Sequence, residues 1–160
     1  MTDETSNVEA TEQQFGIQKI YLKDVSFESP DAPQVFTRDW QPEAEVQLNV
    51  SHQALDTAVW EVELQITVTA RSEERTVYLV EIKQAGVFTT QNIPEEHMGH
   101  LLGSYCPNLL FPFAREAISD LVAKGGFPQL LLAPINFDAV YMQQIEQQGV
   151  SEEAANSTSH

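Results

Sequence analysis

With 160 residues, of which 42% are hydrophobic, the chain is long enough to bury one core and too short to favour two independent domains. Its 24 acidic residues against 8 Lys and Arg give a formal net charge of −16, which repels nucleic-acid phosphates and anionic lipid headgroups and makes both poor partners. The same charge attracts basic partners and keeps exposed apolar surface in solution, although acidity that serves solubility alone is at least as common.

Both ends of the chain are polar and lack hydrophobic periodicity. Residues 1–14 contain no Lys or Arg and no apolar run, so we expect neither a secretory signal nor a transit peptide there. Residues 149–160 are similar, and no apolar stretch between the ends is long enough to span a bilayer. We therefore expect a disordered acidic N-terminus at 1–14, one organised domain at 15–148 and a disordered C-terminal tail at 149–160.

The first half of the organised part predicts four strands. Apolar and polar residues alternate with period two over residues 60–70, which form the clearest strand of the sequence. Residues 43–50 repeat the pattern, and a polar connection at 51–56 is expected to reverse the chain. With further strands at 15–28 and 76–88, four sequential strands joined by short connections imply an antiparallel sheet.

Two of these strands are apolar on both faces. Ile20 and Leu22 in the first strand, and Val77 and Leu79 in the fourth, lie opposite the main apolar set of their strand. Helices can cover one face and a second subunit the other, so the sheet is a candidate for an oligomer. A single chain that wraps its own sheet is also consistent with the pattern.

The second half predicts helices. A long apolar stripe follows Asn92, and Pro107 and Pro112 each remove a backbone donor, so we expect a long kinked helix. A proline-containing loop at 126–135 leads to a short C-terminal helix that Asn136 can cap. Strands followed by helices predict an α+β fold with a four-stranded antiparallel sheet.

No catalytic constellation stands out. His97 and His100 could share a metal from one helix face, but no further ligand is suggested nearby, so we expect neither a metal nor another cofactor. Glu61 and Glu63 look like a solvated strand face rather than an acid/base pair. Cys106 is the only cysteine, which excludes an internal disulfide and favours the cytosol, and its apolar neighbours favour an inert thiol over a nucleophile. The sequence therefore predicts a protein that is not an enzyme.

The segment after the first predicted strand, SPDAPQVFTRDWQP, combines three prolines with Val35, Phe36 and Trp40. Prolines disfavour both a helix and an interior strand, so the segment is expected to be a loop. Its apolar side chains can pack on their own sheet or line a groove for extended apolar segments, and the sequence favours neither.

Four separated segments resemble the SecB family of bacterial protein-export chaperones. They are IYLKDVSFESPDAP, RDWQPE, GSYCPNLLFPFAREAISDLV and GGFPQLLLAPINFDAVYMQQ, in the family's order and spacing over residues 15–148. The resemblance implies a cytoplasmic homotetramer, a dimer of dimers, that holds newly made precursor proteins unfolded. It also implies delivery of these clients to the motor ATPase SecA, with no nucleotide used by the chaperone itself.

The same resemblance implies roles for particular residues. The positions that would bind SecA are Asp24, Glu28, Leu79 and Glu81. The positions tied to tetramer assembly are Val80, Ile82 and Gln84, with Val80 where relatives often carry cysteine. Candidates for the client-binding groove are Val25, Phe27, Phe36 and Trp40.

Two other functions stay open at this point. One is a chaperone of the same fold diverted to another pathway, such as guarding an antitoxin, against which the set of SecA-binding positions argues. The other is a small-ligand-binding or enzymatic α+β domain, which would predict a closed pocket and a stable monomer or dimer.

Overall fold

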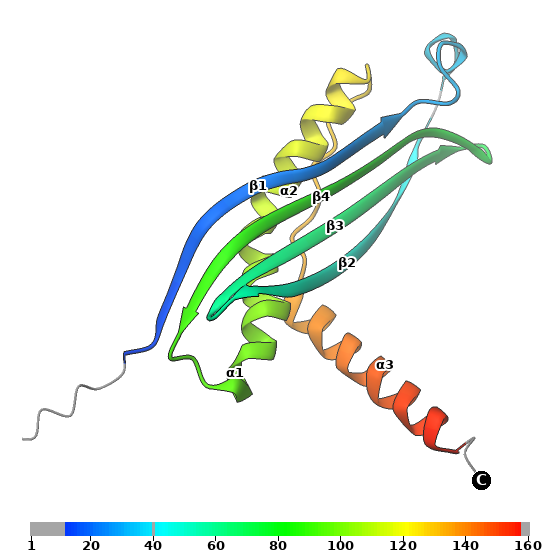
Figure 1. The fold of residues 1–160 in the computed structure, drawn as a ribbon. Coiled ribbons are helices and arrows are strands. Elements are labelled where there is room, and N and C mark those ends of the chain that lie inside the picture. Colours follow the sequence, from blue (N-terminus) through cyan, green and yellow to red (C-terminus); the bar gives the residue numbers. More distant parts are fainter. Residues whose placement is uncertain (1–11, 40, 158–160) are drawn as a thin grey trace, which may run out of the picture.

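The structure, a computed structural model, describes residues 12–39 and 41–157. It consists of one antiparallel sheet with helices on one of its faces (Figure 1). The strands are β1 (Gln14–Glu28), β2 (Glu43–Asp56), β3 (Val59–Ser72) and β4 (Arg75–Gln91). Their order in the sheet is β1-β4-β3-β2, so β1 and β2 form opposite edges and the segment between them passes from one edge to the other. The predicted four-stranded antiparallel sheet is confirmed.

The central strand β3 shows why these residues form a sheet. Val62, Leu64, Ile66 and Val68 are fully buried on the helix side, whereas the polar residues between them face away from the helices. Alternation with period two places every second side chain in the core, so this one strand supplies much of the buried apolar surface.

The reversal between β2 and β3 differs from the prediction at residues 51–56. Those residues stay in β2 and pair with β3, from Ser51↔Glu63 to Ala54↔Trp60. β2 is an edge strand, where polar side chains can remain in solvent. A run of polar residues can therefore belong to this strand, and it does not by itself mark a turn. The chain reverses instead at Thr57–Ala58, with Ala58 at a φ of 54°.

The long helical region runs without a break through α1 (Glu95–His100), the π-helical turn η2 (Leu101–Tyr105) and α2 (Cys106–Lys124). The irregularity is the π turn rather than a break at a proline. Pro107 lies in the first turn of α2, where its missing donor costs little, and Pro112 lies inside α2. Since Pro107 has no N–H for the carbonyl four residues earlier, the wider turn before it is a local response to proline.

The C-terminal helix α3 (Phe137–Ser157) is longer than the predicted short helix. The Oδ1 atom of Asn136 accepts a hydrogen bond from the Ala139 N–H at 3.1 Å and caps it as expected. Residues 149–157 belong to this helix, and the Glu and Ala residues among them are strong helix formers that need no apolar periodicity. The mobility of this tail stays a prediction, as does that of 1–14, most of which lies outside the described residues.

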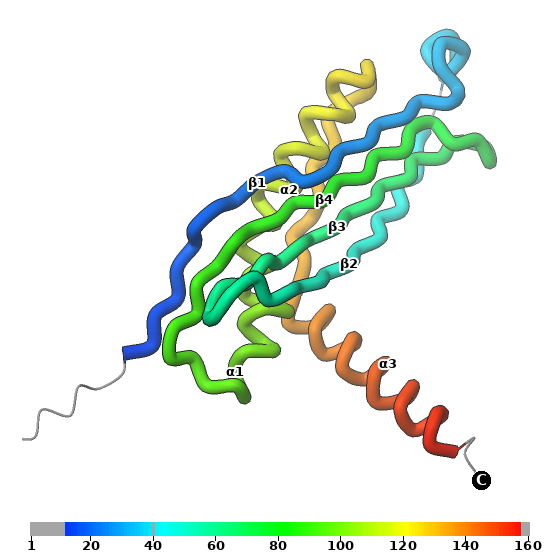
Figure 2. The backbone as a smooth tube through the Cα atoms, viewed as in Figure 1, coloured from blue at the N-terminus to red at the C-terminus, as the bar shows by residue number. Residues whose placement is uncertain are grey.

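One core lies between the sheet and α2. α2 packs across β3 and β4 (Figures 1 and 2) and buries Leu110, Ala114, Ile118 and Val122. The 3-10 turn η1 (Gln34–Thr37) joins this core through Val35. Figure 2 shows that α3 instead extends away from the sheet beyond its first turns.

Candidate client-binding and docking surfaces

Four aromatic rings meet where α2 ends. The Phe127 ring centroid lies 5.0 Å from that of Tyr78, 5.3 Å from that of Phe36 and 6.5 Å from that of Phe27. Phe27 comes from β1, Phe36 from η1, Tyr78 from β4 and Phe127 from the loop after α2, so segments distant in sequence build one aromatic cluster. Phe36 remains 51% exposed, which leaves the cluster open to a ligand.

Two glycines let the rings of this cluster approach the backbone. A Cβ atom on Gly125 would stand 2.2 Å from Cζ of Phe27, so any larger residue would displace that ring. Gly126 has a φ of +88°, and a Cβ there would lie 3.3 Å from the Phe36 ring. Tyr78 and Phe127 are members of the cluster that the sequence did not predict as groove residues.

The predicted groove residues are therefore brought together in part. Phe27 and Phe36 are both in the aromatic cluster. Val25 lies on the same side of β1 as Phe27, because Val25↔Ile82 and Phe27↔Val80 are directly opposed pairs, and it is 40% exposed. Trp40 lies outside the described residues. A client-binding role for these residues stays a prediction.

The predicted SecA-binding residues share the open face of the sheet, which is the face turned away from the helices. Glu28 is directly opposite Leu79, Glu81 is opposite Ser26, and Asp24 follows on the same side of β1. Glu81 accepts hydrogen bonds from the side chains of Gln65, at 3.0 Å, and Thr67, at 3.3 Å. These positions form a row along β1 and β4 with Leu79 at one end and Lys83 opposite Asp24 at the other, and their role in binding SecA stays a prediction.

A polar network that the sequence did not predict crosses the same face. Glu61 is only 8% exposed and accepts hydrogen bonds from the Tyr21 hydroxyl, from Lys23 at 2.9 Å and from Gln53 at 3.1 Å. Lys23 also reaches Glu63 at 3.0 Å. Glu61 is thus buried and paired, so the interpretation of it as a solvated residue is wrong. Tyr21 and Lys23 stand 40 and 38 positions before Glu61, and only the strand register brings them together.

This network shifts the pKa values of its members. The hydrogen bond from Tyr21 is the main cause that lowers the pKa of Glu61, although burial opposes it. Burial, together with the bond to the Glu61 carboxylate, raises the pKa of Tyr21 to about 12. The bonds to the Glu61 and Glu63 carboxylates raise the pKa of Lys23. Each shift keeps the charged carboxylate and its donors in place at neutral pH.

The residues predicted for the tetramer interface lie inside the subunit. Val80 and Ile82 have no exposed surface and Gln84 has 4%, because α2 covers this side of β4. They cannot form a direct interface in this structure. Gln84 Nε2 donates a hydrogen bond to the Tyr21 carbonyl at 3.0 Å, beside a β-bulge of β1. Any role in assembly, which stays a prediction, is therefore indirect, through the position of the edge strand β1.

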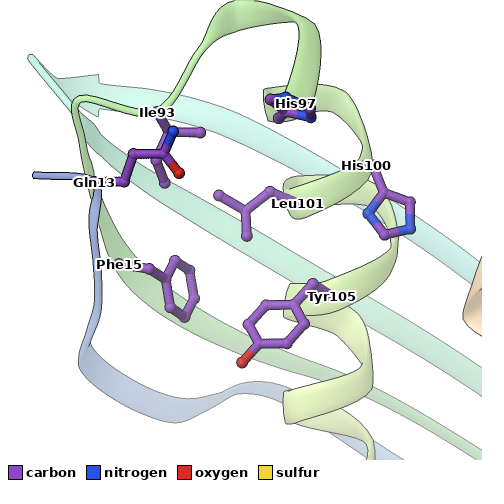
Figure 3. Close-up of a pocket in the computed structure, with 7 residues that line it drawn as sticks. All are labelled: Gln13, Phe15, Ile93, His97, His100, Leu101 and Tyr105. Carbon is purple, nitrogen blue, oxygen red and sulfur yellow. The ribbon is translucent and has the colours of Figure 1, made fainter.

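His97 and His100 line an apolar pocket of about 480 Å³ between β1 and the start of the long helical region (Figure 3). Its wall is largely Phe15, Leu101 and Tyr105. Over the described ranges, no three His, Cys, Asp or Glu side chains are grouped as metal ligands. The pocket therefore offers apolar contacts rather than a donor set for a cation.

A Ser–His–Asp set does occur, with connectivity that differs from a catalytic triad. The Ser104 hydroxyl donates to Asp138 Oδ1, and His100 Nε2 lies 2.7 Å from that same oxygen. A nucleophilic serine needs an imidazole as its base, whereas here the carboxylate takes both bonds. Cys106 has no exposed surface, and burial raises its pKa to about 12, so its thiol is inert at neutral pH.

A groove of about 420 Å³ separates β2 from α3, and we call it the β2–α3 groove. Val50 and His52 line it from the strand, and Tyr141, Gln144 and Ile145 line it from the helix. It combines an apolar base with side-chain amides that can bond to a peptide main chain. No pattern in the sequence predicts this groove, because the strand and the helix that form it are far apart in the chain.

A family model described as SecB, preprotein translocase subunit SecB, matches residues 8–148. The chain belongs to the SecB family. Protein-export protein SecB of Methylococcus capsulatus is 58% identical over 149 residues, which cover 93% of this chain and 95% of that protein. Protein-export protein SecB of Legionella pneumophila strain Corby is 48% identical over 159 residues, which cover 99% of this chain and 98% of that protein.

Among solved structures, the SecB-like chaperone of Mycobacterium tuberculosis in complex with an antitoxin peptide has a TM-score of 0.64. It is 16% identical and covers 76% of this chain and 90% of that chain, so this likeness shows the SecB-like fold alone. The SecB matches confirm the resemblance seen in the sequence and identify a protein-export chaperone rather than an enzyme. In the part of this SecB family member that the structure describes, no helix is long and apolar enough to span a membrane.

Proposed function

We propose that this SecB family member is a cytoplasmic holdase that binds newly made precursor proteins while they are unfolded and passes them to SecA without using nucleotide. The observation that carries the proposal is the aromatic cluster with Phe36 half exposed at its surface. An unfolded client presents apolar side chains in no fixed order, and aromatic rings bind such side chains with little dependence on their identity.

The β2–α3 groove extends this proposal to the main chain of the client. β2 is an edge strand, so one side of its backbone lacks a partner strand. An extended client segment beside it can pair with that backbone and bury alternate side chains against Val50 and Ile145. Backbone pairing is available to every sequence, as a chaperone with many clients requires.

We further propose that the protein assembles as a homotetramer, a dimer of dimers. Three apolar residues on the helix side of β1, and two on the long helical region, are between 40% and 49% exposed in the single chain. They are Ile17, Leu22, Val25, Tyr105 and Phe113. A second copy that covered this side, together with the open edge of β1, would remove much of this surface from water.

SecA is the proposed destination of the client, and the open face of the sheet is its proposed docking site. Glu28 is opposite Leu79, and Glu81 and Asp24 continue a row of carboxylates along β4 and β1, with Lys83 opposite Asp24. A net charge of −16 favours association with a basic segment of a partner, and Leu79 at one end of the row adds an apolar contact that salt does not screen. A chaperone diverted to an antitoxin is not favoured, because the relatives identical at 48% and 58% are named as export proteins.

The test is light-scattering chromatography of the purified full chain, alone and mixed with a denatured precursor diluted into it without ATP. We expect a tetramer that retains the unfolded precursor and ignores its native form. Phe36→Ala should reduce retention severalfold, because it removes the exposed ring of the cluster. Leu55→Ala, at an equally exposed apolar residue near the end of β2 and outside both the aromatic cluster and the proposed interface, is the matched control for the loss of exposed apolar surface.

A monomer that leaves the precursor to aggregate would overturn the holdase proposal and favour a small-ligand-binding protein. If the Phe36→Ala variant retained as much denatured precursor as the wild type, the client would bind at a site other than the aromatic cluster.

A further inference from the structure

The first turns of α3 pack on a helix surface that carries no side chains. Gly99 in α1 and Gly103 in η2 are four residues apart and both face Tyr141. A Cβ atom on Gly103 would stand 2.6 Å from Cδ2 of Tyr141, and one on Gly99 would stand 2.6 Å from its hydroxyl oxygen. The ring atom cannot yield as a flexible chain end could, so Gly103 is the stricter requirement.

A second pair of helix residues holds the same part of α3 by polar bonds. Asp138 Oδ1 accepts a hydrogen bond from the buried Ser104 hydroxyl and lies 2.7 Å from His100 Nε2. The His100 ring also meets the Tyr141 ring edge-on, with centroids 5.8 Å apart. Asp138 and Tyr141 are three residues apart, so both lie on one face of α3.

These six residues form what we call the α3 lock: Gly99, His100, Gly103, Ser104, Asp138 and Tyr141. On the long helical region, Gly99 and Gly103 are four residues apart, as are His100 and Ser104. The side chains of Asp138 and Tyr141, three residues apart on α3, pack against these two pairs. Packing of one helix's i+3 row against another's i+4 row is a common way for helix ridges to fit into grooves. The π turn η2 contains Gly103 and Ser104, so the backbone departs from α-helical geometry where α3 docks. π turns are rare and occur often where a helix has a functional task.

Beyond the lock, α3 has little support. Gln144 is the last half-buried residue, and every described residue from Ile145 to Ser157 is exposed. The groove wall formed by Gln144, Ile145 and Gln148 is therefore held at one end only. A small rotation of α3 about its fixed first turns would therefore move this wall toward or away from β2.

We propose that the α3 lock is a conformational device that holds α3 over β2 and thereby sets the width of the β2–α3 groove for the client. The inference rests on the proposed function for its ligand, but the lock itself is a property of the free protein. Loss of the lock contacts makes α3 more mobile and weakens binding of a client in the β2–α3 groove. The aromatic cluster at the far end of α2 is unaffected.

The experiment compares three alanine variants of the full chain. Gly103→Ala introduces the clash with Tyr141, and Asp138→Ala removes the polar half of the lock. Gly149→Ala is the matched control, because it lies on α3 with no atom within 4 Å of the added Cβ. The first readout is amide hydrogen exchange of residues 138–148 without any client, and the second is the dissociation rate of a permanently unfolded, carboxymethylated protein.

We expect exchange of these α3 amides to become about tenfold faster in Gly103→Ala and Asp138→Ala, and to stay near the wild-type rate in Gly149→Ala. Client dissociation should become severalfold faster in the same two variants. If Gly103→Ala unfolds the protein, Asp138→Ala still decides the question. In addition, Gly103→Ala combined with Tyr141→Ala should be no looser than Tyr141→Ala alone, because the clash needs the ring.

If the amides of residues 138–148 exchanged no faster in Gly103→Ala and Asp138→Ala than in Gly149→Ala, the proposal that the lock residues hold α3 would be overturned. Faster exchange with unchanged client dissociation would overturn its control of the groove. A wild-type protein that captured no client would refute the proposed function, and the exchange data would still decide whether the lock exists.

Discussion

Glu61 shows at the scale of one residue how a carboxylate can be stabilising on an otherwise acidic face. Three donors from β1 and β2 converge on it, and their bonds favour the charged form. Because the folded state lowers its pKa, its contribution is present above the pKa of the unfolded carboxyl and is lost as the pH falls through the folded value. Tyr21 sets the upper limit of the pH range in which the network is stabilising. Its pKa is about 12 in the folded protein and 10.0 in the unfolded chain, so its contribution is lost as the pH rises from 10 to 12.

We therefore predict that Glu61→Gln lowers the free energy of unfolding at pH 7 by about 1–2 kcal/mol, mainly through the bonds from Tyr21 and Gln53. The bridge to Lys23 adds little, because solvent reaches that lysine. Urea unfolding at fixed protein concentration should show the difference shrinking below pH 4.5 and above pH 10. Glu63→Gln is the control, since the ion pairs of Glu63 within the described residues are with Lys23 and Lys83, and an equal loss there would contradict the network.

Single residues also mark the limit of sequence reasoning. Alternation in β3 placed Val62, Leu64 and Ile66 in the core, because a strand with one covered face imposes period two on its own sequence. The partners of Glu61 and the ring contacts of Phe127 have no such local signal. They depend on the register between strands and on where a loop returns, and neither is encoded within a short window.

At the scale of elements, the β2–β3 hairpin is closed by a residue that fits its backbone poorly. Ala58 has a φ of 54°, in the left-handed region that favours glycine. Its carbonyl accepts a hydrogen bond from the Thr90 N–H at 2.9 Å, which ties the turn to β4. The tertiary contact thus helps to hold a conformation that alanine disfavours.

We predict that Ala58→Gly raises the free energy of unfolding by up to about 1 kcal/mol, because the relief of the left-handed conformation exceeds the entropy cost of glycine. Thermal unfolding followed by circular dichroism measures it. Ala54→Gly, three residues before the turn in the extended part of β2, should lower stability instead. A loss of stability in both variants would show that Ala58 is unstrained.

The element boundaries that the sequence missed share one cause. Residues 51–56 and 149–157 lack apolar periodicity, which predicts a turn and a tail, yet the first segment belongs to an edge strand and the second to an exposed helix. Hydrophobic periodicity detects only the part of an element that meets a core. The SecB resemblance, in contrast, supplied the fold as a whole, because it rests on separated segments rather than on local pattern.

At the scale of the whole molecule, the proposed docking site on the open face of the sheet and the net charge of −16 would both attract a basic partner. We predict that Asp24→Asn and Glu81→Gln each weaken binding of SecA about three- to tenfold at low salt, with a smaller effect at 0.3 M NaCl. Isothermal titration at both salt concentrations measures this. Glu146→Gln, which removes the same charge from exposed α3, is the control, and an equal effect there would reduce the docking site to net charge alone.

The strand order also determines when the sheet can be completed. β1 is first along the chain but pairs with the last strand, from Gln14↔Gln91 to Glu28↔Leu79, whereas β2, β3 and β4 follow one another through short turns. Closing the longer loop is slower, so the hairpins form first and β1 joins them afterwards. During synthesis, the apolar residues of β1 therefore emerge from the ribosome before their partner strand exists. A newly made copy of the chaperone therefore exposes apolar segments before it folds, as its unfolded clients do.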